Sequence, residues 1–135
     1  MKLRLSTTAK ILLALACTAA AIIGFMLKLP REFRHMDKEL HSLFYFLAAA
    51  FFNLLFVQRS LLKHVLVFVL LYLFGAGIER AQEYSNRFFR TRIHGRYDPE
   101  DVQANLEGLL AFSALWFVVV ILWLVFKKKQ TGSAS

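Results

Sequence analysis

Four long apolar runs dominate this sequence of 135 residues. They cover residues 9–27, 42–58, 61–78 and 106–126. About 20 apolar residues in a helix cross the hydrocarbon core of a bilayer, and the second and third runs lie at the short end of that range. A backbone in lipid must satisfy its own hydrogen bonds, which favours helices. The sequence therefore predicts an all-α bundle of four transmembrane helices, with the hairpin 42–78 packed against the first and fourth.

The charged residues between these runs are divided unequally between the two sides of such a bundle. With four spans, both termini and the turn at Arg59 share one side, which carries lysine and arginine but no carboxylate. All nine acidic residues fall on the other side, mostly in the first loop (28–41) and the long loop (79–105). Basic segments stay in the cytoplasm, so both termini are predicted to be cytoplasmic and the long loop extracytoplasmic. The predicted location is the bacterial cytoplasmic (inner) membrane, crossed several times.

Composition narrows the possible partners. A net charge of +8 would suggest nucleic acid for a soluble protein, but here the excess lies at the cytoplasmic edges, where it marks orientation and anionic lipid. No nucleic-acid partner is therefore predicted. The single Cys17 excludes an internal disulfide and a cysteine-based metal cluster. His35, His41, Asp37 and Glu79 leave metal binding open, but no paired-histidine helix motif supports it, and neither a metal nor a cofactor is predicted.

The two ends of the chain carry their own expectations. The basic start and apolar run of the first 24 residues also resemble a signal peptide, and Ala14–Cys17 resembles a lipoprotein cleavage site. The apolar run continues past Cys17 to Leu27, which favours an uncleaved first span. Residues 1–129 are predicted to form a single domain, and the small polar tail 130–135 is predicted to be disordered.

Polar residues gather where three of the predicted helices meet the outer side. The second helix is expected to begin near Asp37, four residues before His41, and the third to continue past the membrane through Glu79 and Gln82. Asp98 is a good N-cap for a fourth helix running from about Pro99 to Phe126. The 3-4-3 spacing of its polar positions places them on one face. These positions are Asp98, Asp101, Asn105 and Gly108.

Ionisable groups at membrane depth persist by pairing or by serving a function. His41 is therefore expected within reach of Glu79 or Asp101, and Arg96 is expected to pair with Asp98 or Asp101. Simpler roles remain open: Asp98 as a plain cap, and Asn105 or Asn53 as hydrogen-bond bridges between helices. Two carboxylates with a histidine are also able to perform general acid–base catalysis, so whether the protein is an enzyme stays open.

These residues resemble the motifs of the VanZ-like family of small bacterial membrane proteins, named for a member linked to teicoplanin resistance. The resemblance rests on Asp37-Lys38-x-x-His41, on Glu79-x-x-Gln82, and on Gly95-Arg96-x-Asp98-x-x-Asp101-x-x-x-Asn105-x-x-Gly108. It covers residues 20–125 and implies a four-helix membrane domain with the polar residues clustered. The chain departs from the family at Glu107 and in a longer arginine-rich stretch between Gln82 and Arg96.

The resulting functional hypothesis is an outward-facing polar pocket that engages a cell-envelope molecule, with a possible link to glycopeptide (teicoplanin) tolerance. The ligand would be a lipid-linked precursor, a phospholipid headgroup or a peptidoglycan stem, because guanidinium groups of the outer loop bind phosphate and carboxylate bidentately. The predicted pocket residues are Asp37, His41, Glu79, Gln82, Arg96, Asp98, Asp101 and Asn105. The alternative is a non-catalytic accessory subunit of a larger membrane complex, in which the polar residues only hold the helices together.

Overall fold

The computed structural model describes residues 4–26, 35–90 and 98–132. Its helices are α1 (Thr7–Met26), α2 (Asp37–Phe52) with a π-helical continuation η2 (Asn53–Val57), α3 (Leu61–Phe89) and α4 (Pro99–Gly132). Taking α2 and η2 as one span, four helices in the described part are long and apolar enough to cross a membrane. The all-α prediction is confirmed to that extent, and the architecture is that of a multi-pass membrane protein.

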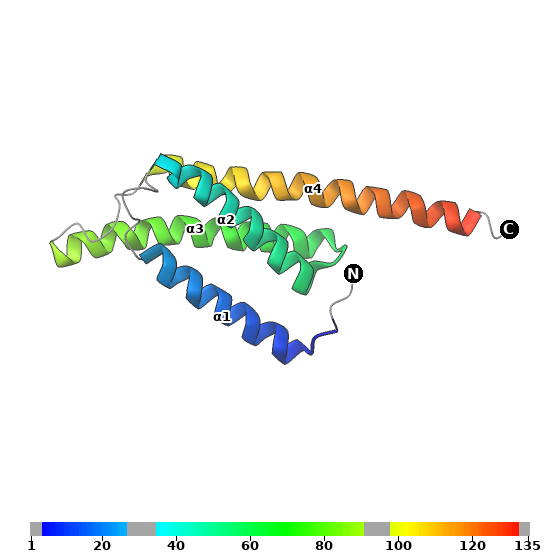
Figure 1. The fold of residues 1–135 in the computed structure, drawn as a ribbon, viewed down its shortest axis with the longest axis horizontal. Coiled ribbons are helices and arrows are strands. Elements are labelled where there is room, and N and C mark those ends of the chain that lie inside the picture. The colour runs from blue at the N-terminus through cyan, green and yellow to red at the C-terminus, as the bar shows by residue number, and fades with distance from the viewer. Residues whose placement is uncertain (1–3, 27–34, 91–97, 133–135) are drawn as a thin grey trace.

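Successive helices alternate in direction, so that α1 begins and α4 ends toward the same side of the molecule (Figure 1). α2 and α4 run along each other in the most extensive contact between any two helices of the described chain, and α3 lies against both. We call the end where α2 and α4 begin the polar end. The opposite end, where residues 58–60 connect η2 to α3, is called the turn end.

The core lies between α2 and α4 and is continued by α3. Tyr45, Leu109 and Trp116 are buried there, and Leu109 is fully covered. Large apolar side chains on the outer faces are exposed, for example Leu62 and Leu70 of α3. A soluble protein would not leave so many exposed together, whereas lipid tails cover such a surface without penalty.

The first helix departs from the prediction that it packs against the hairpin. None of the residues of α1 is buried, and the helix diverges from the bundle toward its N-terminal end (Figure 1). It is attached near its other end, where Gln82 Nε2 donates to the carbonyl oxygen of Phe25 at 2.6 Å. In lipid, apolar side chains gain little by leaving the bilayer for a helix surface. The almost wholly apolar α1 therefore has few contacts that would draw its full length inward.

The helix boundaries refine the predictions. α2 begins at Asp37 and α4 at Pro99, both as predicted. α3 extends to Phe89, so Arg87 to Phe89 belong to a helix and not to the outer loop in which they were placed. α4 continues to Gly132, three residues into the tail 130–135 that was predicted to be disordered.

Candidate functional site

The polar end is organised by a close approach of α2 and α4 at Gly108. A Cβ atom at Gly108 would collide with the backbone carbonyl of Ser42 on α2. Glycine therefore lets the two backbones touch, as small residues do at membrane helix contacts. One face of α2 (Asp37, His41) is pressed in this way against the face of α4 that carries Asp101 and Asn105. The predicted common face of α4 is confirmed for Asp101, Asn105 and Gly108, which are all buried, whereas Asp98 precedes the helix and is half-exposed.

His41 bridges the two helices. Its Nδ1 lies 2.8 Å from Oδ1 of Asn105, and Asn105 is 1% exposed. Oδ1 only accepts hydrogen bonds, so Nδ1 donates in this contact. The other ring nitrogen, Nε2, lies 3.7 Å from Oδ1 of Asp37. The ligand atoms of Asp37, His41 and Asp101 all lie within 4.8 Å of one another, which confirms that His41 is within reach of Asp101.

Lys38 is a member of this site that the prediction left out, although it stands in the motif used for the resemblance. Its Nζ lies 2.9 Å from Glu100, 3.1 Å from Asp98 and 3.4 Å from Asp101. One ammonium group is therefore shared by three carboxylates at the start of α4. Arg96, which was expected to pair with Asp98 or Asp101, lies outside the described residues.

Asp98 combines the two roles that the sequence left open. Its Oδ1 accepts a hydrogen bond from the backbone N–H of Glu100 at 2.9 Å, which caps α4, and its Oδ2 contacts Lys38. The backbone N–H bond and then the Lys38 ammonium lower the pKa of the Asp98 carboxyl, since both favour its charged form. Asp98 therefore holds both the end of α4 and Lys38 in place.

α3 contributes two residues that behave differently. Glu79 is 1% exposed, and its Oε2 has no hydrogen-bond partner among the described residues. Its carboxylate is close enough to Asp101, His41 and Asp37 to interact with them electrostatically. Gln82 instead donates to α1, as described above. The structure thus brings together Asp37, His41, Glu79, Asp98, Asp101 and Asn105, whereas Gln82 is a tie to α1 at the edge of the cluster.

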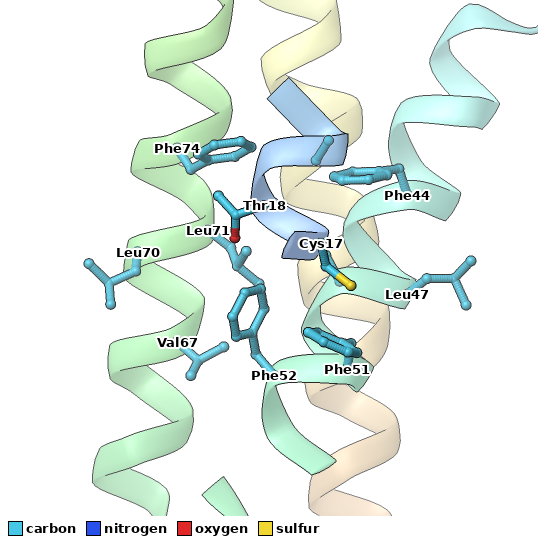
Figure 2. A pocket seen from close by; sticks show the side chains of 12 residues that line it. Cys17, Thr18, Phe44, Leu47, Phe51, Phe52, Val67, Leu70, Leu71 and Phe74 are labelled. Atoms are coloured by element: carbon cyan, nitrogen blue, oxygen red, sulfur yellow. The ribbon is translucent and has the colours of Figure 1, made fainter. Parts of the chain in front are cut away.

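An apolar groove opens beside this cluster, between α1 and the α2–α3 hairpin. It has a volume of about 480 Å³, within the range of small-molecule pockets. Figure 2 shows Cys17 and Thr18 of α1 facing aromatic side chains of α2, with Leu71 and Phe74 of α3 on the other wall. The Thr18 hydroxyl donates to Ala14 O within α1, so it adds no unpaired donor to the groove.

The groove reaches the polar cluster through two aromatic rings. Phe44, which lines the groove, meets Phe25 edge-on with ring centroids 4.7 Å apart. The Phe25 ring lies in turn 5.3 Å from the His41 ring. The rings of Phe25 and Phe44 therefore form an apolar connection between His41 and the groove.

A second polar cluster lies toward the turn end, and only part of it was predicted. Asn53 bridges to a neighbouring helix as expected, because His64 Nδ1 of α3 lies 2.7 Å from its Oδ1. His64 Nε2 lies 3.0 Å from Ser113 Oγ of α4, and the His64 ring stacks on Trp116 at 4.1 Å and 7°. The sequence offered one signal for His64, namely its position close to the predicted turn and 11 residues after Asn53. Its bonds are all satisfied internally, which indicates a structural role.

No known protein family, curated protein or solved structure matches this chain. The site must therefore be interpreted from its own geometry.

Proposed function

We propose that the chain is a VanZ-like protein of the bacterial cytoplasmic membrane whose polar end faces outward and binds an amphipathic lipid of the cell envelope. The headgroup would lie at the cluster of His41, Glu79 and Asp101, and one hydrocarbon chain would lie in the groove beside α1. A phospholipid or a lipid-linked precursor fits this description, and binding of such a precursor would connect the protein to glycopeptide tolerance. The observation that carries the proposal is an apolar groove of about 480 Å³ that is linked to a buried polar cluster by the rings of Phe44 and Phe25.

The chemistry of the site supports a ligand in two ways. Burial of Glu79 with an unpaired oxygen costs about 1–3 kcal/mol in a folded protein, and a headgroup donor would remove that penalty. The loose attachment of α1 also leaves a lateral path by which a chain can enter the groove from the bilayer. Arg87 is paired with Glu83 at 2.9 Å, and residues 91–97 lie outside the described structure.

Filling the groove should weaken lipid binding. In Ala21→Phe a ring is added on the face of α1 that lines the groove. The overpacking should cost about 1–3 kcal/mol, which corresponds to about 5- to 150-fold weaker binding. Binding of a phospholipid with a fluorescent acyl chain to the protein in nanodiscs measures this. Ala19→Phe, on an exposed position of the same helix, is the matched control and should bind as the wild type does.

The headgroup half of the proposal is tested by Asp101→Asn, which should weaken binding of the same lipid while Ala19→Phe does not. The wild type should also raise glycopeptide tolerance when expressed in cells, and the variant should not. Unchanged binding and unchanged tolerance in both Asp101→Asn and Ala21→Phe would rule out the pocket.

The accessory-subunit alternative makes a different statement about the same residues. Asn105 holds α2 to α4 through His41. If the polar cluster is purely structural, Asn105→Ala should lower the melting temperature of the protein even when no lipid is present. If Asn105→Ala and Glu79→Ala melt at much lower temperature in detergent while Asp101→Asn still binds lipid normally, the structural interpretation is favoured. If they stay folded and lose the tolerance phenotype, the pocket is favoured.

The orientation gives a separate expected result. With basic residues before α1 and three lysines after the last apolar run, both termini should be cytoplasmic. Alkaline phosphatase fused after Ser135 should therefore be inactive, and a green fluorescent protein fused there should fluoresce. An active phosphatase fusion would place the polar end in the cytoplasm and exclude an outer-leaflet ligand.

A further inference from the structure

We propose that Asp37, His41 and Asp101 form a binding site for one divalent transition-metal ion of the Zn²⁺ or Mn²⁺ type. The sequence predicted no metal, because it shows no pair of histidines on one helix. The fold brings together ligands from two helices instead, with Asp37 and His41 on α2 and Asp101 on α4. Their ligand atoms lie within 4.8 Å of one another.

The spacing suits coordination. Two ligand atoms held about 2.1 Å from a shared ion at the tetrahedral angle lie roughly 3.4 Å apart. His41 Nε2 and Asp37 Oδ1 are separated by 3.7 Å, so a small movement of either side chain closes the site on an ion. Both residues are one helical turn apart on α2, which fixes their relative position. Gly108 holds α4 close enough to add Asp101.

The hydrogen bond between His41 and Asn105 prepares the imidazole for a metal. Because Nδ1 is engaged with Asn105 Oδ1 at 2.8 Å, Nε2 is the ring nitrogen left for a metal ion. Nε2 lies 3.7 Å from Oδ1 of Asp37, and the ligand atoms of Asp37, His41 and Asp101 lie within 4.8 Å of one another. Metal-binding histidines usually donate their second N–H to an oxygen in this way.

Glu79 is the second, independent indication. Its carboxylate is almost completely buried and accepts a hydrogen bond from the backbone N–H of Asp98, whereas Oε2 has no partner among the described residues; the charges of Asp101, His41 and Asp37 act on it. A carboxylate in such a place normally has a cationic or donor partner. A metal ion at Asp37, His41 and Asp101 would supply this positive charge at a distance, because Glu79 is not among the three residues whose ligand atoms converge.

Lys38 does not block the site. Its contact with Asp101 is its longest, 3.4 Å against 2.9 Å to Glu100 and 3.1 Å to Asp98. Asp101 also has a second oxygen. A mixed set of imidazole nitrogen and carboxylate oxygen favours Zn²⁺ or Mn²⁺, whereas Mg²⁺ and Ca²⁺ prefer oxygen alone. The metal site stands whether or not a lipid binds, although a bound cation would also attract the phosphate of a headgroup.

Titration of the full-length protein in nanodiscs with Zn²⁺, Mn²⁺ and Mg²⁺ separately tests the proposal. Calorimetry and elemental analysis should show one Zn²⁺ or Mn²⁺ per chain and much weaker Mg²⁺ binding. Asp37→Asn, His41→Gln and Asp101→Asn should each weaken the preferred ion by about tenfold or more, since loss of a mere partner of a ligand already costs 10–100-fold. Glu107→Gln, an exposed carboxylate of α4 outside the cluster, is the matched control and should bind normally.

Melting curves recorded without metal identify any variant that fails to fold. The half-exposed Asp37 makes Asp37→Asn the variant least able to disturb the bundle. Stoichiometric binding that persists in Asp37→Asn and Asp101→Asn would overturn the proposal. So would a wild type that binds neither Zn²⁺ nor Mn²⁺. Neither result depends on the lipid experiment, so the two proposals fail separately.

Discussion

Gly108→Ala is expected to destabilise the protein by about 2 kcal/mol, enough to weaken the contact of α2 with α4. The added methyl group would meet the backbone carbonyl of Ser42, and the next nearest atoms, the carbonyl carbon of Ser42 and the amide nitrogen of Phe46, also belong to the backbone. A backbone cannot rotate away as a flexible side chain can. Overpacking of this kind costs about 1–3 kcal/mol or more, which exceeds the gain of about 1 kcal/mol from replacing glycine in a helix.

Gly77→Ala provides the control for this result. A Cβ at Gly77 on α3 would meet nothing within 4 Å, so the helix-propensity gain acts alone and stability should stay equal or rise slightly. Thermal unfolding of both variants in the same detergent, followed by circular dichroism, makes the comparison. If Gly108→Ala melts at the same temperature as Gly77→Ala and the wild type, α2 and α4 are not held together at this contact. Weaker metal binding should accompany the weakened contact, because Asp101 would move away from Asp37 and His41.

The polar face of α4 illustrates what the sequence was able to predict. Asp101, Asn105 and Gly108 share a face because residues three or four apart on a helix are neighbours, and this holds whatever the helix packs against. The starts of α2 and α4 were predictable for a similar reason. Asp98 and Pro99 form a local helix-start signal, and the structure uses both residues in that way.

The partner of each face was harder to predict. Nothing in the spacing of Asp37 and His41 says whether α3 or α4 lies opposite, and the contact with Asn105 depends on the backbone approach at Gly108. Gln82 was placed in the pocket because it follows Glu79 by three residues. In the structure it donates to Phe25 O, a backbone atom that carries no signal in the sequence.

The turn end shows a second limit. Asn53 begins the π-helical turn η2, in which Gln58 N–H bonds to Asn53 O, and such turns insert one extra residue into a helix. The side-chain Nδ2 of Asn53 donates to Ala49 O, which leaves its Oδ1 for His64. Periodicity assumes a regular helix, so it misplaces faces beyond such an insertion. The cluster of His64, Ser113 and Trp116 was not foreseen for another reason: these residues lie on α3 and α4, and nothing in their spacing says which helix each one faces.

That cluster carries the other large expected effect. Trp116→Ala should lower the stability by about 3–5 kcal/mol, because the buried indole stacks on His64 at 4.1 Å and its Nε1 donates to Gln58 O at 3.2 Å. Gln58 has a positive φ of 54° and ends η2, so this donor also secures the connection between η2 and α3. Removing the ring leaves a cavity between α3 and α4, and it leaves the Gln58 carbonyl without the indole.

Two further variants separate these contributions. Trp116→Phe keeps an aromatic ring for His64 but loses the N–H donor, so it should cost only about 1 kcal/mol. Trp123→Ala removes the same residue type from the same helix at a more exposed position. There the Arg59 guanidinium lies over the indole ring, 3.7 Å from its centre. Contacts of that kind are worth about 0.5–1 kcal/mol at an exposed site. Unfolding in detergent should therefore rank the variants as Trp116→Ala far below Trp116→Phe and Trp123→Ala. Equal losses at positions 116 and 123 would show that lipid or detergent replaces the buried indole, and that the His64 cluster does not hold the turn end together.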